Sequence, residues 1–204
     1  MSETADLTLE RLDQAGRELL FHQARTANTF APIPVSDEEL EAIWELAKWP
    51  PTGGNTQPLR VVFVRTPEGK ARLLPHMFEG NQAKTEAAPV AAILAVDKRF
   101  HEHIPTVLPF RPEMKDVFEA NPEMREKAGS LSAALQAAYF ILAVRANGLA
   151  AGPMGGFDAA GLDAEFFPDG RLGSFLVVNI GHPGTDPWFD RLPRLDHEQV
   201  ISWA

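Results

Sequence analysis

The chain has 204 residues, 45% of them hydrophobic, and a formal net charge of −9. This composition suits one domain over residues 1–204 with a real core, and it excludes an intrinsically disordered chain. The negative charge argues against a protein that tracks nucleic-acid phosphates, and the absence of cysteine excludes disulfides, thiolate zinc sites and cysteine nucleophiles.

The first predicted elements are two helices and a strand. Leucines at helical spacing predict a helix over Thr8–Gln23. Ser36-Asp37-Glu38-Glu39 has the pattern of a capping box and begins a second helix. Pro50 ends this helix, whose apolar face is expected to hold Leu40, Ile43, Trp44 and Ala47. The β-branched run Val61–Val64 predicts a buried strand.

The middle of the chain continues the alternation. Thr66-Pro67-Glu68 starts a helix, and Asn81–Ala87 forms a shorter one. The apolar run Pro89–Val96 predicts a strand covered on both faces. His101–Lys127 holds four prolines and mixed charge, which indicates a surface excursion with one or two short helices.

Ser130–Asn147 is apolar around nearly its whole circumference, which predicts a central helix and leaves open that it also faces a partner subunit. Gly148 is its expected cap. Phe157–Phe167 predicts a further helix and Leu172–Ile180 a buried strand, and Gly181–Ala204 reads as an extended arm.

These elements predict an α+β fold with a small sheet of three or four strands, flanked by helices, and with arms at both ends. Arms of this kind are hard to bury on one subunit, so a homodimer with exchanged segments is expected. The first 25 residues lack the apolar segment of a signal peptide, and the most apolar run, Leu131–Val144, is interrupted by polar residues. We therefore expect a cytoplasmic protein without a membrane span.

The common catalytic motifs are missing. The sequence has no Walker loop, no G-x-G-x-x-G after a strand and no G-x-S-x-G elbow. His101 and His103 fit two exposed side chains on a polar loop better than a metal pair. We predict neither a metal site nor a catalytic side chain.

What remains is a set of polar and glycine residues on loops. It comprises Arg25, Thr26 and Asn28; Thr52, Asn55 and Gln57; Asn81 and Lys84; Pro153, Met154, Gly155 and Gly156; and Arg194. Singly, each is more often a turn, a cap or a solvated charge. Their occurrence together in one chain supports a functional interpretation.

The spacing within this set fits a flat, phosphorylated ligand. Asn81 and Lys84 share one helix face, where an amide and an ammonium suit a polar ring edge that gains negative charge. A glycine-rich backbone at Gly152–Gly156 can lie flat against a ring. Arg25 and Arg194 could address one phosphate.

The ordered series resembles the nitroreductase family over nearly the full length. The matching motifs are R-[ST]-x-x-x-F from Arg25, P-[TS]-x-x-N-x-Q-P over Pro51–Pro58, N-x-x-K from Asn81, P-x-x-G-F-D from Pro153 and L-P-R at Leu192–Arg194. Within the family, A-R-T-x-N, K-W-x-P-T, G-P-M-x-G-F-D and R-L-P-R-L resemble the branch that contains malonic semialdehyde reductase.

The resemblance implies a homodimer with two FMN sites, each lined by both subunits. It implies that Arg25 and Arg194 hold the FMN phosphate, that Asn81 and Lys84 meet the pyrimidine edge, and that Gly155 and Gly156 approach N5. It places the loop from Pro51, with Thr52, Asn55 and Gln57, against the flavin held mainly by the other subunit.

The implied activity is ping-pong hydride transfer from NADPH or NADH through FMN to a small second substrate. The expected acceptor is malonic semialdehyde, which becomes 3-hydroxypropionate, with Arg99, Arg111 or Lys115 as a partner for its carboxylate. Three alternatives stay open: a broad nitro and quinone reductase, a flavin-binding protein without turnover, and a dimer without a cofactor.

Two positions depart from the family pattern. Many relatives carry Arg or Lys where Asn28 stands, so the flavin is expected to be harder to reduce. Many carry glutamate where Gly155 stands, and glycine there is expected to favour an anionic substrate.

Overall fold

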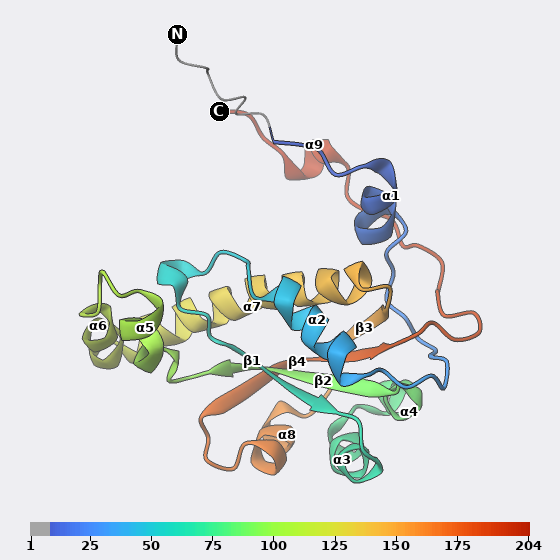
Figure 1. Cartoon of the computed structure of the whole chain (residues 1–204), viewed down its shortest axis with the longest axis horizontal. Coiled ribbons are helices and arrows are strands. Elements are labelled where there is room, and N and C mark those ends of the chain that lie inside the picture. The colour runs from blue at the N-terminus through green and yellow to red at the C-terminus, as the bar shows by residue number, and fades with distance from the viewer. Residues whose placement is uncertain (1–8) are drawn as a thin grey trace.

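The computed structural model describes residues 9–204 and has a four-stranded antiparallel sheet between two layers of helices (Figure 1). The strand order is β1-β2-β4-β3, so β1 and β3 form the two edges. The strands are β1 (Leu59–Val64), β2 (Val90–Asp97), β3 (Ala150–Met154) and β4 (Leu172–Gly181). The predicted fold class is confirmed.

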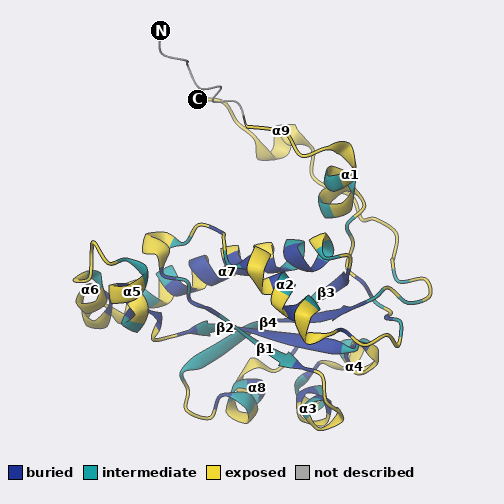
Figure 2. Cartoon of the chain, viewed as in Figure 1, coloured by how far each residue is buried: buried dark blue, intermediate teal, exposed yellow. Residues whose placement is uncertain are grey.

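Helices cover the sheet on both faces. One face packs against α2 (Asp37–Ala47) and α7 (Pro122–Ala146), and the other against α3 (Pro67–Leu73), α4 (Glu79–Ala87) and α8 (Ala159–Phe166). β2 contributes alternate residues to the two cores, which explains its near-continuous apolar sequence. Figure 2 shows β2 buried, β1 and part of β4 half-buried, and the C-terminal arm exposed.

The helix starts follow the sequence closely. The Ser36 hydroxyl accepts from the Glu39 N–H, and the Ser36 N–H donates to the Glu39 carboxylate, so the predicted capping box is present. The Thr66 hydroxyl caps α3 by accepting from the Gly69 N–H. Gly148 follows α7 with a φ of 77°, as the predicted glycine cap requires. Trp44 differs from the prediction, because it is 37% exposed while its neighbours on that face are buried.

The surface excursion (His101–Lys127) contains more regular structure than the sequence predicted. Short helical segments follow one another from residue 100 to 120: η4 (Phe100–His103), α5 (Ile104–Val107) and α6 (Met114–Ala120). α7 then begins at Pro122, eight residues before the predicted start, because proline suits the first turn of a helix. The prediction of two exposed histidines was wrong for His101, which is buried and bonds to Glu119.

The first helix is shorter than predicted. It comprises α1 (Gln14–Arg17) followed by the π-helical turn η1 (Glu18–His22), and the predicted start at Thr8 lies outside the described residues. Leu9, Leu12 and Leu19 are exposed, so within one chain their spacing reflects no buried face.

β3 is the strand that the sequence analysis missed. Gly152–Met154 was predicted as part of a flat glycine loop, yet Gly152 pairs with Asn179 and Pro153 with Val178. Glycine and proline weaken strands, but an edge strand tolerates proline because one of its sides lacks a ladder partner.

The two arms leave the body together. The N-terminal arm (residues 24–31) runs beside the C-terminal arm (residues 182–204), which carries α9 (His197–Val200) and is largely exposed (Figure 1). The Thr29 hydroxyl donates to the Thr185 carbonyl over 2.7 Å, and the Ala31 N–H donates to the His182 carbonyl over 2.9 Å. The predicted arms are therefore present and contact each other.

α7 is buried on one side only. Its Phe140 and Val144 lie in the core, whereas Leu131, Leu135 and Tyr139 are exposed. The helix is long and apolar enough to cross a membrane by length and composition, but it packs against α2 and the sheet like a core helix. The expectation of burial on most sides is thus not met within one chain.

Candidate functional site

The N-terminal arm covers the free edge of β3. The Ala27 N–H donates to the Ala151 carbonyl over 3.0 Å, and Ala27, Phe30, Ala88 and Ala150 form a small buried cluster. A Cβ on Gly152 would lie 2.7 Å from the Ala27 carbonyl oxygen, so glycine permits this close approach. The contact places three candidate residues beside β3: Arg25, Thr26 and Asn28.

Asn81 joins α4 to the end of β3. Its amide donates to the Gly156 carbonyl over 2.8 Å, and the Phe78 N–H donates to the same oxygen over 3.1 Å. A Cβ on Gly156 would lie 2.6 Å from the Asn81 amide nitrogen, whereas a Cβ on Gly155 would meet nothing within 4 Å. The backbone at Gly155 therefore borders open space beside a fixed amide.

Lys84 lies one helical turn after Asn81 and is half-buried. Among residues 9–204 its ammonium group forms no hydrogen bond and no ion pair with another side chain. The neighbouring Pro153 is half-buried, and Met154 is buried in the core, so Met154 can offer a ligand only its backbone.

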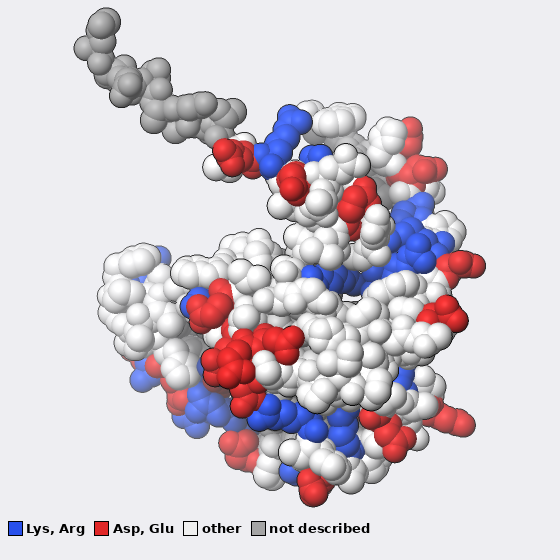
Figure 3. Space-filling view, turned by 45° about the vertical axis from the view of Figure 1, so that its right-hand side comes forward, with Lys and Arg blue, Asp and Glu red and all other residues white. Residues whose placement is uncertain are grey.

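Three arginines meet where the arms join the body. Arg25 donates to the Phe189 carbonyl over 3.2 Å, and Arg145 donates to the Arg25 carbonyl over 3.4 Å. Arg191 donates to the Ala24 carbonyl over 3.1 Å. Figure 3 shows basic side chains gathered in this region. A cavity of about 270 Å³ lies here, and its lining includes Arg25, Arg145, Trp188 and residues 148–151, which lead into β3.

The charge of this arginine cluster is not balanced by acids. In the described part of the chain, none of Arg25, Arg145 and Arg191 forms an ion pair with a carboxylate. Burial, followed by the nearby charge of Arg191, lowers the pKa of Arg145. An anion in the cavity would relieve this repulsion.

Arg194 makes no hydrogen bond to the residues that Arg25, Arg145 and Arg191 contact among residues 9–204. Its guanidinium donates to the carbonyls of Leu192 and Pro193 in its own arm, over 2.9 and 3.1 Å. In the part of the chain from residue 9 onward, Arg25 and Arg194 therefore share no hydrogen-bond partner. Arg145 and Arg191 instead accompany Arg25, and the sequence analysis missed both.

The proline loop (residues 50–58) has a strained backbone. Gly54, Asn55 and Gln57 have positive φ values of 62°, 53° and 45°. The Asn55 amide donates to the Val107 carbonyl over 2.7 Å, and the Gln57 amide donates to the Asn55 side-chain oxygen over 3.1 Å. Both amides are thus held in fixed positions.

The other residues of this loop define its exposed surface. Pro51 is exposed and Thr52 half-buried, and the Gly53 N–H donates to the Ser132 hydroxyl over 3.2 Å. The loop is thereby tied to α7 and to the excursion.

One chain therefore carries two separate groups of candidate residues. The first, the edge cluster, lies along β3 and α4 and comprises Arg25, Thr26, Asn28, Asn81, Lys84, Pro153, Gly155 and Gly156. The second is the proline loop, which precedes β1. The start of β1 pairs with Val96 at the far end of β2, whereas β3 pairs with the part of β4 nearest the arms. The two groups lie toward opposite ends of the sheet (Figure 1).

Comparisons with known proteins give one consistent match. Residues 22–182 match the sequence model of the nitroreductase family. A Streptomyces coelicolor protein, provisionally named NADH dehydrogenase/NAD(P)H nitroreductase, is 61% identical over 196 residues, covering 96% of this chain and 97% of its own length.

Solved structures share the fold at low identity. A Bacillus subtilis structure described as a nitroreductase superimposes with a TM-score of 0.83 at 19% identity, covering 94% of this chain and all (100%) of its own. A structure from Exiguobacterium sibiricum, described as a nitroreductase in complex with FMN, gives a TM-score of 0.79 at 19% identity and covers 97% and 100% of the two chains.

Proposed function

The chain belongs to the nitroreductase family, and on that premise we propose that it is an FMN-dependent oxidoreductase that uses NADPH or NADH. The observation that carries the proposal is the edge cluster, where a fixed amide, a half-buried ammonium and an open glycine backbone lie along the same edge strand as Arg25. Among residues 9–204, Arg25 and the neighbouring Arg145 and Arg191 form no ion pair with a carboxylate. The proposed unit is one FMN-binding domain over residues 1–204, located in the cytoplasm.

The residues present fit FMN. A phosphate monoester is recognised by guanidinium groups, and Arg25 and Arg145 line a cavity whose lining among residues 9–204 includes no carboxylate. A flat ring needs backbone without side chains, and the open space at Gly155 meets that need. The Asn81 amide and the Lys84 ammonium are donors of the kind that a pyrimidine edge accepts.

We assign the roles as follows. Arg25 binds the phosphate, assisted by Thr26 and by Arg194 from the C-terminal arm. Asn81 and Lys84 bind the polar ring edge, and Lys84 stabilises negative charge that develops there. When bound, FMN supplies reversible hydride acceptance between NAD(P)H and the second substrate. The chain's own residues bind and orient the flavin and adjust its reduction potential, and none of them is needed as a nucleophile.

The separation of the two groups of candidate residues supports a homodimer. The proline loop lies far along the sheet from the edge cluster of its own chain. Its backbone is strained and its two side-chain amides are held in place, which is typical of a loop that binds a ligand. A two-fold assembly would bring the proline loop of one subunit to the edge cluster of its partner. The exposed apolar face of α7 gives this assembly a surface to bury.

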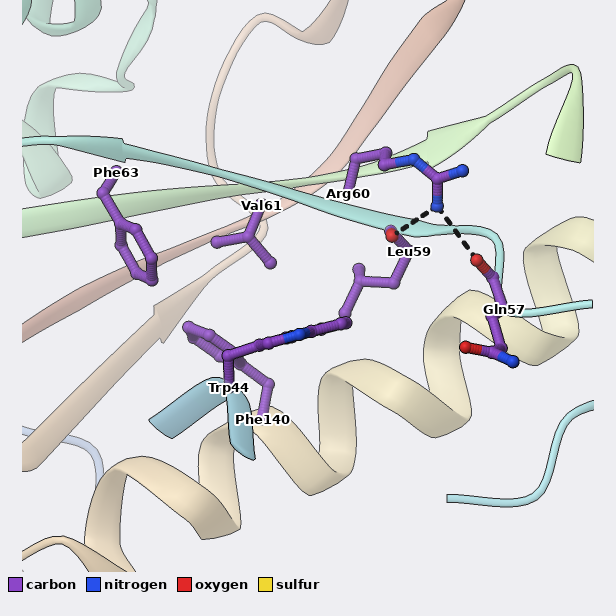
Figure 4. A pocket seen from close by; sticks show the side chains of 7 residues that line it. All are labelled: Trp44, Gln57, Leu59, Arg60, Val61, Phe63 and Phe140. Carbon is purple, nitrogen blue, oxygen red and sulfur yellow. Dashed lines mark hydrogen bonds between the residues drawn. The ribbon is translucent and has the colours of Figure 1, made fainter. Parts of the chain in front are cut away.

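An apolar pocket beside β1 supports exchanged arms. It has a volume of about 380 Å³ and lies between α2 and β1, with Trp44 across it, Gln57 near one end and Phe63 near the other (Figure 4). β1 is a free edge, and Val200, Ile201 and Trp203 of the C-terminal arm are exposed. We propose that the partner's C-terminal arm lies along this edge and fills the pocket.

For the second substrate we propose malonic semialdehyde, reduced to 3-hydroxypropionate. Support comes from the motifs of the branch and from Gly155, which leaves room without negative charge. Of the three cations considered for the substrate carboxylate, Arg99 is paired with Glu102 and Arg111 with Glu113. Lys115 has no ion pair among the described residues and is the best of the three.

A broad nitro and quinone reductase is the second candidate. The name of the Streptomyces coelicolor relative favours it, since that protein matches nearly the whole chain. Both candidates would use the same flavin contacts and differ only in how the excursion and its Lys115 shape the substrate pocket.

The decisive experiment starts with the visible spectrum of the purified protein. We expect a flavin spectrum that bleaches on anaerobic titration with NADPH or NADH and returns with an acceptor. Turnover is then compared for malonic semialdehyde, menadione and nitrofurazone. A preference for the last two would identify the broad reductase, bound flavin without any turnover would identify a non-catalytic flavin protein, and a folded protein that refuses FMN would refute the proposal.

A further inference from the structure

Lys70 is a buried lysine that the proposed function does not use. It lies on α3 and is only 8% exposed. Its ammonium donates to two carbonyl oxygens at the C-terminal end of α4, that of Thr85 over 2.5 Å and that of Ala88 over 2.6 Å. The last carbonyls of a helix lack partners within the helix, and a cation complements their partial negative charge.

The position of this charge is costly. Burial lowers the pKa of Lys70 to about 8, and Glu86 on α4, the charged group that acts on it, only partly restores it. Among the described residues no carboxylate lies within ion-pairing distance of Lys70. Because a buried ammonium lowers stability unless it is compensated, a helix cap alone is a weak reason to keep one.

A buried polar layer connects Lys70 with the floor of the edge cluster. The Asn179 amide donates to the Thr85 hydroxyl over 3.2 Å, and that hydroxyl lies 3.9 Å from the Met154 sulfur. Within residues 9–204 the Asn179 side-chain oxygen finds no hydrogen-bond partner, although it is buried. Thr85 follows Lys84 directly, so this layer lies beneath the residue proposed to meet the ring edge.

α4 is therefore held at both ends. Near its start, the Asn81 amide binds the Gly156 carbonyl, and at its end the Lys70 ammonium binds Thr85 and Ala88. Ala88 also packs against Ala27 of the N-terminal arm. A shift at this end of α4 would move Lys84 and the arm together.

We propose that Lys70 is a positioning residue for the flavin site: its positive charge fixes the C-terminal end of α4 and thereby sets Lys84 and Asn81 against the ring edge. The inference rests on the proposed FMN site and names a residue that controls it. A neutral amine would keep two donors but lose the interaction of the charge with the helix end. The affinity of the site for FMN is therefore expected to fall when Lys70 loses its proton.

The test uses three variants of the full chain. Lys70→Arg keeps a charge at every pH used, Lys70→Met keeps the length without charge, and Lys127→Met removes an exposed lysine on α7 as the matched control. The dissociation constant of FMN is measured by flavin fluorescence quenching from pH 7 to pH 9.5. Thermal unfolding of each apo protein is followed over the same range.

For the wild type and Lys127→Met we expect the dissociation constant to rise about tenfold across this range, with a midpoint near pH 8 or somewhat above it. Lys70→Met should bind about tenfold more weakly already at pH 7 and show a flat profile. Lys70→Arg should bind as the wild type does at pH 7 and stay flat.

The outcomes separate the inference from the proposed function. If no variant and no wild type binds FMN, the proposed function fails. If FMN binds but the pH profile of Lys70→Met follows that of the wild type, Lys70 is only a cap and the inference is overturned. Unfolding of the apo protein guards against a folding artefact, because Lys70→Arg and Lys70→Met can be compared at equal folded fraction.

Discussion

Gly155 and Gly156 have different surroundings although they are neighbours in the chain. A side chain on Gly156 would collide with the Asn81 amide, whose bond to the Gly156 carbonyl joins α4 to β3. We predict that Gly156→Ala lowers the free energy of unfolding of the apo protein by about 1–3 kcal/mol, because the amide must move from a half-buried bond. Gly155→Ala, whose Cβ meets open space, should stay within about 0.5 kcal/mol in the same urea titration.

Asp97 is the buried carboxylate at the end of β2. It accepts hydrogen bonds from Arg60 over 2.8 Å and from Arg171 over 3.0 Å. Burial alone would raise the pKa of Asp97, but these bonds and charges hold it below its ordinary value. We predict that Asp97→Asn lowers the free energy of unfolding by about 2–4 kcal/mol at pH 7.

The pH dependence of this loss has a definite sign. A carboxyl group with a lowered pKa in the folded state contributes stability above its unfolded pKa and loses it as the pH falls. The difference between wild type and Asp97→Asn should be full at pH 7 and should shrink as the pH falls below 3.8, the ordinary value for Asp97. Denaturant titrations at several pH values measure it, and a difference that stays constant below pH 3 would contradict this assignment.

The edge strand β3 and the N-terminal arm form one element of the site. Gly152 lets the Ala27 carbonyl approach β3 to within van der Waals contact. The atom nearest to an added Cβ is this backbone oxygen, which cannot move aside as the end of a side chain could. We predict that Gly152→Ala separates the arm from β3 and breaks the bond from the Ala27 N–H to Ala151. Hydrogen exchange at Ala27 and tryptic cleavage after Arg25 should both become faster by about tenfold or more.

The matched control for this prediction is Gly80→Ala on α4, where an added Cβ meets nothing within 4 Å. Alanine replaces glycine in a helix there, so stability should rise by up to about 1 kcal/mol and the arm should stay in place. Equal cleavage rates in the two variants would show that the arm does not depend on the close approach at Gly152.

Local chemistry explains which elements could be predicted. The capping box at Ser36, the proline start of α3 and the apolar run of β2 each determine their element through neighbouring residues, and each was found. β3 was missed because Gly152 and Pro153 usually interrupt strands, and only the pairing with β4 and the cover from the N-terminal arm make a strand of them. Contacts between distant segments leave no pattern in a short stretch of sequence.

The same reasoning applies to the candidate site. Asn81, Gly156 and Arg25 were identified from their order in the chain, and the structure brings Asn81 and Gly156 into contact. Arg145 was overlooked because its partner, the Arg25 carbonyl, comes from a segment 120 residues away. A lone arginine in a helix carries no pattern, so only the folded arrangement reveals its place in the arginine cluster.

On the scale of the whole molecule, the exposed stripe on α7 and the exposed arms are features that one chain leaves without partners. Leu131, Leu135 and Tyr139 lie on one side of a helix whose other side is core. If two copies bury this stripe against each other, a charge placed there must be desolvated, at a cost of several kcal/mol.

We predict that Leu135→Glu yields a monomer by sedimentation and, because each proposed flavin site draws on both subunits, a protein that binds FMN at least tenfold more weakly. Ala160→Glu is the matched control, since it adds the same charge to an exposed position on α8, on the opposite face of the sheet. That variant should remain a dimer with its flavin. A Leu135→Glu monomer that keeps full FMN affinity would mean that the edge cluster alone holds the ring and that the proline loop serves another purpose.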